Sequence, residues 1–428
     1  MNTDAGNTDV KGKNHMDVSV DVLVIGGGIA GLWTLARLQQ AGYKTVLLES
    51  QALGAGQTRF AQGIIHGGTK YALTGKLTAS SEAVADMPAR WRACYEGKGE
   101  LDLTQAELLS DAHYLWSTTS LTSRISGFFA SKVMRSRSTE LNKKSLPTIF
   151  QHKDFNGRFY RLDEPVFNTL SVLRAIAEPR KQSILLVKQE SIDHLDNQLV
   201  VQSKTGENYL FRYKKIIFMA GEGNENLLSR FACEKPAMQR RPLKMVVMRG
   251  GPSDRLADMI YAHCLGASVN PRITITSHRD QQGNIIWYMG GQLAEEGVTK
   301  SDEELIQVAK KELAELIPWL ELRNSQWGVL DINRAEINLS GKKAAVTTRP
   351  DSFSIVKNKN VITAWPTKMA LSPALADAIV TIIDEENIVR DADKTLPAWQ
   401  QPEYAEFPWD GDDCWSTESE SPKLESGS

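Results

Sequence analysis

A glycine-rich turn near the start of the chain constrains its fold more than any other feature. The turn Gly26-Gly27-Gly28-Ile29-Ala30-Gly31 follows an apolar run and opens a stretch of helical character. In such a strand–turn–helix unit the first glycine permits the tight turn, the second lets the backbone approach a pyrophosphate, and the third lets the helix pack on the strand. The helix N-terminus offers N–H donors and a positive dipole end to phosphates. The pattern predicts a dinucleotide site.

A carboxylate stands at the spacing that such a site requires. Thr45-Val46-Leu47-Leu48 reads as a second strand, and Glu49 follows it 18 positions after Gly31 (49 − 31). A ribose-binding carboxylate is expected about 20 residues beyond the glycines. This context favours a dinucleotide site over an unrelated glycine-rich turn.

Length and charge exclude several other classes of protein. The 428 residues suffice for two domains, and 50 Lys and Arg against 52 Asp and Glu leave no broad electrostatic footprint for nucleic acid. No apolar run approaches the length of a membrane span, and residues 1–16, a lead expected to be disordered, lack the apolar core of a secretory signal. The scattered cysteines suit a reducing compartment and predict neither a metal site nor a disulfide: Cys94, Cys233, Cys264 and Cys414. We therefore expect a cytoplasmic protein.

The nucleotide-type strands recur far apart in the chain. Apolar runs near residues 22, 185, 216 and 361 are separated by β-rich segments, and helices are expected at 302–316 and 372–383. This organisation resembles the FAD-dependent oxidoreductases of the D-amino-acid oxidase and glycerol-3-phosphate dehydrogenase superfamily, over roughly residues 18–383. The resemblance implies an α/β (α+β) fold in which a Rossmann-like FAD-binding domain is interleaved with a β-rich substrate domain. The expected FAD segments are 17–90, 180–230 and 330–385, the substrate segments are 91–179 and 231–329, and an acidic disordered tail is expected over 400–428.

Three motifs carry the resemblance in detail. Residues 63–71, GIIHGGTKY, look like the I-H-G-G-x-x-Y segment of glycerol-3-phosphate dehydrogenases and are similar to the H-A-G segment of L-2-hydroxyglutarate oxidases. Residues 219–221 resemble the strand end near the adenosine, and residues 367–373 occupy the place of the loop that meets the flavin. The residues implied in FAD binding are Gly26, Gly28, Ile29, Ala30, Gly31, Glu49, Ser50, Gly56, Thr58, Gln62, Gly63, Ser191, Ala220, Gly221, Thr367, Lys368, Met369, Ala370 and Leu371.

The chain also departs from the family pattern. Relatives place a Gly-His or Gly-Lys pair before the last helix, whereas this chain has Trp365-Pro366-Thr367-Lys368. An Arg-Pro motif near Asp-Gly appears only as residues 349–352, RPDS, and the loop after Gly221 is unusually acidic. These departures leave the expected cofactor in place and the substrate open.

Three side chains are candidates for catalysis. His66 is either a base that takes the substrate proton beside the flavin or a structural histidine bonded to its loop. Arg334 lies where relatives carry a substrate-clamping arginine, and a guanidinium binds a carboxylate or phosphate through a bidentate fork. Arg349 competes for that role, and Lys368 either faces flavin N1, binds a substrate anion or extends into solvent. Tyr71 and Tyr288 are either pocket hydroxyls or ordinary core residues.

The resemblance implies hydride transfer from a CH–OH or CH–NH carbon of a small, anionic substrate of the glycerol-3-phosphate, 2-hydroxy acid or amino acid type. The electrons would pass to oxygen, a quinone or another carrier. Two rival functions remain: a flavoprotein whose FAD is structural or regulatory, and an NAD-linked dehydrogenase. Residues 124–135 are both basic and apolar, which suits either peripheral contact with an anionic membrane or a lid over the substrate domain.

Overall fold

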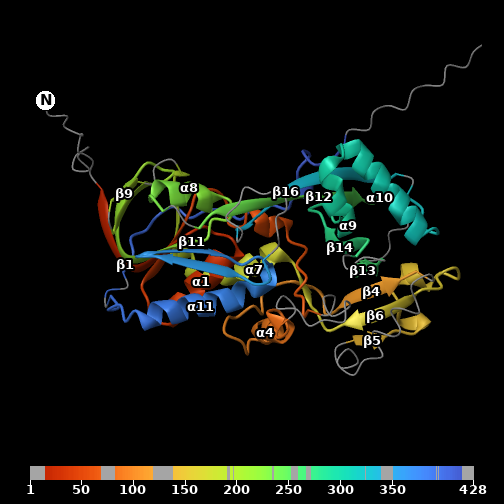
Figure 1. Ribbon diagram of the computed structural model, residues 1–428, viewed down its shortest axis with the longest axis horizontal. Coiled ribbons are helices and arrows are strands. Elements are labelled where there is room, and N and C mark those ends of the chain that lie inside the picture. Colours follow the sequence, from red (N-terminus) through yellow and green to blue (C-terminus); the bar gives the residue numbers. More distant parts are fainter. Residues whose placement is uncertain are drawn as a thin grey trace, which may run out of the picture.

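Two large β-sheets stand side by side in the computed structural model of this chain (Figure 1). We call them the first sheet and the second sheet. The structure describes residues 15–68, 82–118, 138–189, 193–195, 197–233, 236–251, 259–266, 271–322, 324–338, 350–391, 393 and 395–416. All structural statements below concern these residues.

The first sheet has a parallel core with antiparallel strands at its margins. Its five parallel strands, in spatial order, are β18 (Val361–Trp365), β11 (Asn208–Phe218), β1 (Met16–Ile25), β2 (Thr45–Glu49) and β8 (Ile184–Leu186). The antiparallel strands are β17 (Ser354–Asn358), which pairs with β18, and the pair β9 (Asp193–Leu195) and β10 (Gln198–Gln202), which continues from β11. The central strands are buried on both faces, which explains why they read as continuous apolar runs.

Helices cover both faces of the first sheet. One face packs against α1 (Ile29–Gln40), α4 (Met87–Tyr95), α7 (Thr169–Ala177) and α11 (Ser372–Glu385). Trp33 of α1 meets Trp91 of α4 with ring centroids 4.8 Å apart, and both side chains are fully buried. The other face packs against α8 (Gly223–Arg230). A parallel sheet covered on both faces is the layer architecture that places a ligand site at the strands' carboxyl ends.

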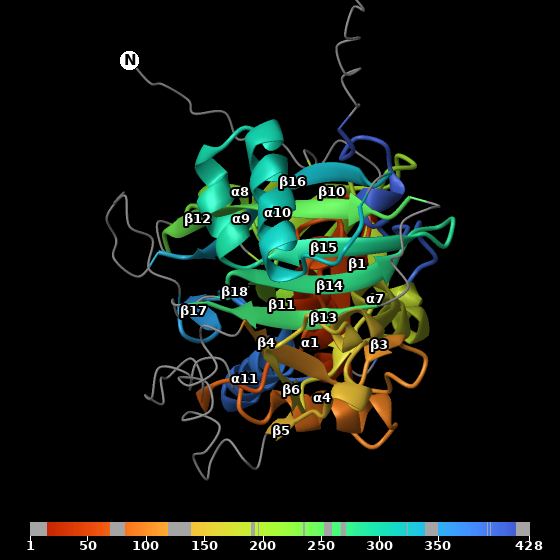
Figure 2. The ribbon, with the colours of Figure 1, turned by 90° about the vertical axis from the view of Figure 1, so that its right-hand side faces the viewer.

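The second sheet is antiparallel except where β13 pairs with β4 (Figure 2). Its order is β16 (Gln326–Ile337), β12 (Met238–Arg249), β15 (Ile285–Gly290), β14 (Ile273–Arg279), β13 (Tyr261–Leu265), β4 (His113–Ser117), β6 (Arg158–Leu162) and β5 (Ser138–Glu140). Val246 and Met248 pack under α9 (Gln292–Glu296) and α10 (Asp302–Leu316), whereas Met245 and Val247 belong to the core shared with the first sheet. This alternation follows from the two-residue period of a strand. A small pair, β3 (Leu108–Ser110) and β7 (Val166–Phe167), completes the sheets.

The expected interleaving of two domains is present, but two expected boundaries differ from the structure. Residue 330, where an FAD segment was expected to begin, lies inside β16, which pairs with β12 along its whole length. Helix α7 and residues 91–95 of α4, expected in the substrate domain, pack with α1 in the core of the first sheet. Helix α10 has the expected bounds, because Ser301 and Glu304 form a reciprocal capping box at its start.

The expected disordered tail is wrong for residues 400–416. Ala405 donates its backbone N–H to Leu53, and Trp415 forms a β-bridge with Gly328 of β16. Trp409 is fully buried, with its ring 4.6 Å from that of His278. The acidic composition predicts disorder, but buried aromatic residues hold this segment against the rest of the protein. Residues 1–14 and 417–428, also expected to be disordered, lie outside the described residues.

Candidate active site

The glycine turn after β1 has no room for side chains at two of its positions. Gly26 has φ +115°, and a Cβ there would lie 2.5 Å from the carbonyl oxygen of Met219. A Cβ on Gly31 would lie 1.9 Å from the carbonyl oxygen of Gly26. The sequence-based roles of Gly26 in the turn and Gly31 in close packing are therefore confirmed.

Gly28 differs because its free side faces a cavity. A Cβ added there would meet only the Thr58 hydroxyl, at 3.2 Å. The hydroxyl accepts a hydrogen bond from Ile29 N at 3.1 Å. The first turn of α1 has no acidic residue, and its N-cap residue, Gly28, has no side chain to cap it. Its N-terminal dipole thus remains available to an anion in the cavity.

Glu49 closes the carboxyl end of β2 and is tied to the glycine turn. Its Oε2 accepts from Gly27 N at 2.6 Å, and its Oε1 accepts from Ser50 N at 2.7 Å and Gln51 N at 2.8 Å. Burial raises the pKa of Glu49, although these three N–H donors act in the opposite direction. Oε2, which accepts only one of these bonds, retains lone-pair capacity for a hydroxyl donor, as ribose binding requires.

A cavity of about 700 Å³ extends from the glycine turn to the second sheet. Most residues expected to bind the cofactor or substrate line it: Gly26, Gly28, Ile29, Ala30, Glu49, Ser50, Gly56, Thr58, Gln62, His66, Ala220, Gly221, Arg334, Thr367, Lys368 and Met369. The structure thus gathers segments separated by more than 300 positions around one space. Ser191 lies outside the described residues.

Four residues expected to bind the cofactor do not line this cavity, because each packs against other parts of the protein. Gly31 abuts Gly26, as described above, and a Cβ on Gly63 would lie 2.0 Å from the Phe167 carbonyl oxygen. Ala370 accepts a hydrogen bond from the Trp91 indole at 3.1 Å, and Leu371 is fully buried in the core. The motif resemblance located their segments correctly but not which residues of each segment face the cavity.

The loop before α11 explains one departure from the family pattern. Thr367 has φ +61°, a left-handed conformation that favours glycine and strains a β-branched residue. Its hydroxyl donates to the Ser352 carbonyl oxygen at 2.9 Å, which holds the loop in place. Lys368 follows, 8% exposed, with Nζ 3.5 Å from the Asp351 carbonyl oxygen. The short helix η9 (Met369–Leu371) then leads into α11.

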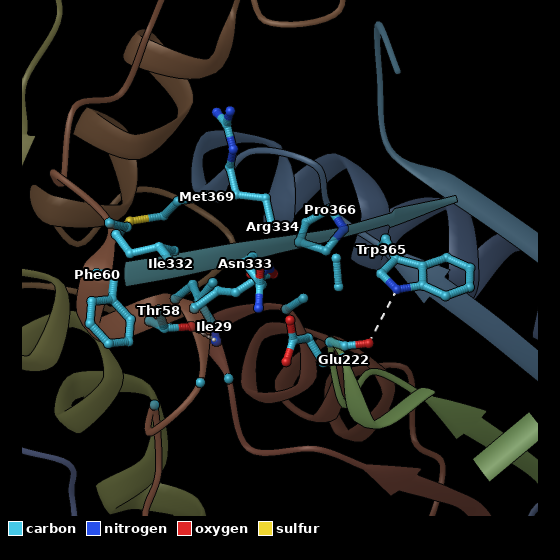
Figure 3. A pocket seen from close by; sticks show the side chains of 18 of the residues that line it. Ile29, Thr58, Phe60, Glu222, Ile332, Asn333, Arg334, Trp365, Pro366 and Met369 are labelled. Atoms are coloured by element: carbon cyan, nitrogen blue, oxygen red, sulfur yellow. Dashed lines mark hydrogen bonds between the residues drawn. The ribbon is translucent and has the colours of Figure 1, made fainter. Parts of the chain in front are cut away.

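Arg334 of β16 lines the cavity opposite the glycine turn. Figure 3 shows its side chain on the opposite side of β16 from Asn333 and Glu222. Its Nε and Nη2 are buried and have no hydrogen-bond partner among the described residues. Arg241 lies directly across in β12, but it forms a paired contact with the buried Glu336, at 2.6 and 3.2 Å. Of these two facing arginines, Arg241 is paired with a carboxylate, whereas no described residue forms a hydrogen bond with Nε or Nη2 of Arg334.

His66 lines the same cavity, on the loop that follows η2 (Gln57–Phe60). Its Nδ1 is 3.5 Å from Oε2 of Glu164. Tyr288 proves to be a core tyrosine, fully buried, whose hydroxyl donates to the Phe60 carbonyl oxygen at 3.0 Å. Tyr71 and Arg349 lie outside the described residues, as do residues 124–135.

The residues around the cavity fit FAD. The glycine at the helix start leaves open space, the N-terminal dipole of α1 suits a pyrophosphate, and Glu49, held by the glycine turn, suits ribose hydroxyls. The loop at Thr367–Met369, at the far end of the same cavity, fits the expected place of the flavin.

Sequence reasoning missed several residues of the site. Gln57 donates to the Asn333 carbonyl oxygen at 2.9 Å and so joins the loop after β2 to β16. Glu164 and His263 also approach the cavity from the second sheet. No local pattern marks these residues, because each is isolated in the sequence: the fold alone brings Gln57 to β16, and Glu164 and His263 to His66.

Comparisons with known proteins agree with this geometry. A family model described as FAD dependent oxidoreductase matches residues 21–365. The probable FAD-dependent oxidoreductase PA4991 of Pseudomonas aeruginosa is 44% identical over 394 residues, 92% of this chain and 98% of that protein. Its crystal structure has a TM-score of 0.77 at 39% identity, with the same coverage of the two chains.

More distant solved structures share the fold alone. L-α-glycerophosphate oxidase of Mycoplasma pneumoniae, solved with FAD bound, has a TM-score of 0.58 at 14% identity and covers 86% of this chain and 95% of its own. Glycine oxidase of Geobacillus kaustophilus has a TM-score of 0.57 at 13% identity, with 87% and 96% covered. Within the part of the chain that the structure describes, no helix is both long and apolar enough to span a bilayer.

Proposed function

Because this chain belongs to the FAD dependent oxidoreductase family, we propose that it oxidises a CH–OH or CH–NH carbon of a small anion held by Arg334. FAD is its cofactor, which removes the NAD-linked dehydrogenase from consideration. The choice among glycerol-3-phosphate, 2-hydroxy acid and amino acid substrates belongs to the proposal, as does the electron acceptor: oxygen, a quinone or another carrier.

One observation supports the inference that the substrate is an anion. The Nε and Nη2 atoms of Arg334 are buried in the cavity wall and have no hydrogen-bond partner in the described part of the chain, while the facing Arg241 is neutralised by Glu336. A buried guanidinium without a counter-charge is costly, and a carboxylate or phosphate that accepts from both nitrogens would remove that cost. Lys368 lines the same cavity and adds a second positive charge.

The roles of the side chains follow from this placement. Bound FAD supplies the acceptor for the hydride. Arg334 holds the anionic end of the substrate, so that the carbon to be oxidised is fixed in orientation. His66 takes the proton from the substrate hydroxyl or amine as the hydride leaves the adjacent carbon with its electron pair. The product is a carbonyl or an imine, and the proton remains on the imidazole until it is released to solvent.

The names of the structural neighbours support both substrate classes. Glycine oxidase and L-α-glycerophosphate oxidase share the fold and act on substrates that carry a carboxylate or a phosphate. At 13% and 14% identity they do not select between them. Both substrate classes carry an anionic group, and Arg334 could bind either group through its Nε and Nη2 donors.

The test is an anaerobic substrate screen of the purified FAD-bound protein. Glycerol-3-phosphate, a series of 2-hydroxy acids, a series of amino acids and their uncharged analogues are mixed with the protein, and loss of the oxidised flavin absorbance is followed. We expect anionic compounds alone to bleach the flavin. Bleaching only by uncharged alcohols or amines contradicts the clamp, and no bleaching by any compound favours a structural FAD.

A further inference from the structure

Three of the seven histidines meet beside one buried carboxylate at the edge of the cavity. His66 comes from the loop after η2, His113 from β4 and His263 from β13. The His66 and His263 rings stack with centroids 5.7 Å apart, and the His113 ring lies edge-on to His263 at 4.1 Å. The carboxylate is Glu164, 3% exposed, between β6 and β7.

Glu164 holds both the backbone and the ring of the His66 loop. Its Oε1 accepts from Gly67 N at 2.8 Å, while its Oε2 lies 3.5 Å from Nδ1 of His66. Burial alone would raise the pKa of Glu164, but the contact with His66, the nearby His113 and the Gly67 N–H outweigh it and lower the pKa. The carboxyl group is therefore ionised, and it can only accept hydrogen bonds.

An acceptor beside Nδ1 fixes the tautomer of a neutral imidazole. The carboxylate favours the tautomer with the proton on Nδ1, toward Glu164, which leaves the lone pair on Nε2. The Nδ1 atom is buried, whereas the His66 side chain is 18% exposed, so the exposed part is the remainder of the ring. His66 lines the cavity, and its Nδ1 is buried on the side toward Glu164.

The neighbours of His66 restrain its ring further. His263 stacks on it and is itself anchored, with Nδ1 2.7 Å from the Thr274 hydroxyl. The titratable groups that face His66 are Glu164 from the β6–β7 loop, His113 from β4 and His263 from β13. Tyr261, also on β13, packs against Ile64 and Val166 at the base of the same loop.

We propose that Glu164 is a positioning residue for His66, which it holds in the Nδ1–H tautomer with Nε2 directed to the substrate. This inference rests on the proposed function, in which His66 receives the substrate proton. An ionised carboxylate also stabilises the imidazolium that forms when the proton arrives, as in other carboxylate–histidine pairs.

Glu164→Gln is the informative variant because it is nearly isosteric. Its amide oxygen can still accept from Gly67 N, which leaves an NH₂ group, a donor, against His66 Nδ1. A donor at that position favours the reverse tautomer, with the proton on Nε2. Glu164→Asp keeps the charge and is the conservative rescue. Asp163→Asn is the matched control, because this adjacent carboxylate is 68% exposed and bonds Arg92 instead.

The experiment records ¹⁵N spectra of the FAD-bound protein with labelled histidine, using His66→Asn to assign the His66 signals. In Glu164→Gln we expect the Nε2–H tautomer of His66 and a titration midpoint lower by about one pH unit or more. Anaerobic flavin reduction should slow by about 10²–10⁴-fold, the range for loss of a general base, with FAD content unchanged. Glu164→Asp should recover part of the rate, and Asp163→Asn should match the wild type.

The two claims fail in different ways. A His66 tautomer and midpoint unchanged in Glu164→Gln overturn the positioning role of Glu164. A changed tautomer with flavin reduction at the wild-type rate overturns instead the proposed role of His66 in the oxidation. If Glu164→Gln does not fold, Glu164→Asp decides, because its ionised carboxylate should preserve the wild-type tautomer, and loss of that tautomer overturns the inference.

Discussion

The two walls of the cavity are built in opposite ways. The nucleotide wall is built around one short segment, residues 26–31, in which Gly26 and Gly31 are required by close backbone contacts, and the loops at 54–58 and 219–223 complete it. The opposite wall assembles single side chains from separate strands and loops, among them His66, His263 and Arg334. The first wall binds a constant cofactor with its backbone. In the second wall, replacement of individual side chains can alter which substrate binds while the fold stays the same.

The largest expected effect distinguishes two glycines of the nucleotide wall. Gly31→Ala places a Cβ 1.9 Å from the Gly26 carbonyl oxygen, so the free energy of unfolding should fall by at least about 3 kcal/mol. Gly28→Val should instead leave the fold intact and yield colourless protein, because its Cβ would meet only the Thr58 hydroxyl, at 3.2 Å, and the rest of the side chain would enter the cavity. Chemical denaturation measures the first effect, and flavin absorbance per chain measures the second.

A third glycine provides the control for this pair. A Cβ on Gly411 would meet no atom within 4 Å, so Gly411→Ala should change the unfolding free energy by less than about 0.5 kcal/mol. Full flavin occupancy in Gly28→Val, or wild-type stability in Gly31→Ala, would show that the two glycines do not divide these roles.

The next effect tests the opposite wall. His66→Ala should slow anaerobic flavin reduction by about 10²–10⁴-fold while FAD remains bound, because the proton acceptor is lost but the nucleotide wall is untouched. His152→Ala, at a histidine 38% exposed, is the control and should reduce at the wild-type rate. A rate within a few fold of wild type in His66→Ala would assign His66 a structural role. Loss of FAD would show that the loop, rather than the imidazole, is what matters.

The smallest effect concerns the strained residue between the two walls. Thr367→Gly removes the backbone strain of a left-handed threonine, which costs about 1–2 kcal/mol. It also loses the hydrogen bond to Ser352 and raises the conformational entropy of the unfolded chain, and both of these effects lower stability. We expect its stability to stay within about 1 kcal/mol of wild type. Thr367→Val keeps the strain and loses the bond, so it should be the less stable of the two by about 1 kcal/mol. Equal stabilities from thermal denaturation would argue against strain at this position.

The same contrast explains what could be predicted from the sequence. The β1–α1 unit, the later strands of the first sheet and the roles of Gly26 and Gly31 depend on local spacing, which a sequence displays directly. Glu164 depends on a contact across 98 positions (164 − 66) and follows no motif. The acidic composition of residues 400–416 predicts disorder. In the structure this segment is ordered, because burial of Trp409 and the neighbouring aromatic ring stabilises it.

The most direct test of the account is the affinity of Arg334 variants for the anionic substrate identified by the screen. Titrations followed by flavin absorbance under anaerobic conditions give the dissociation constant for wild type, Arg334→Lys and Arg334→Ala. Loss of the charged fork should cost about 1.5–3 kcal/mol, a roughly ten- to hundredfold rise in the dissociation constant, with FAD content unchanged. The effect should be smaller in Arg334→Lys, which keeps the charge. Wild-type affinity in both variants would contradict the anion clamp.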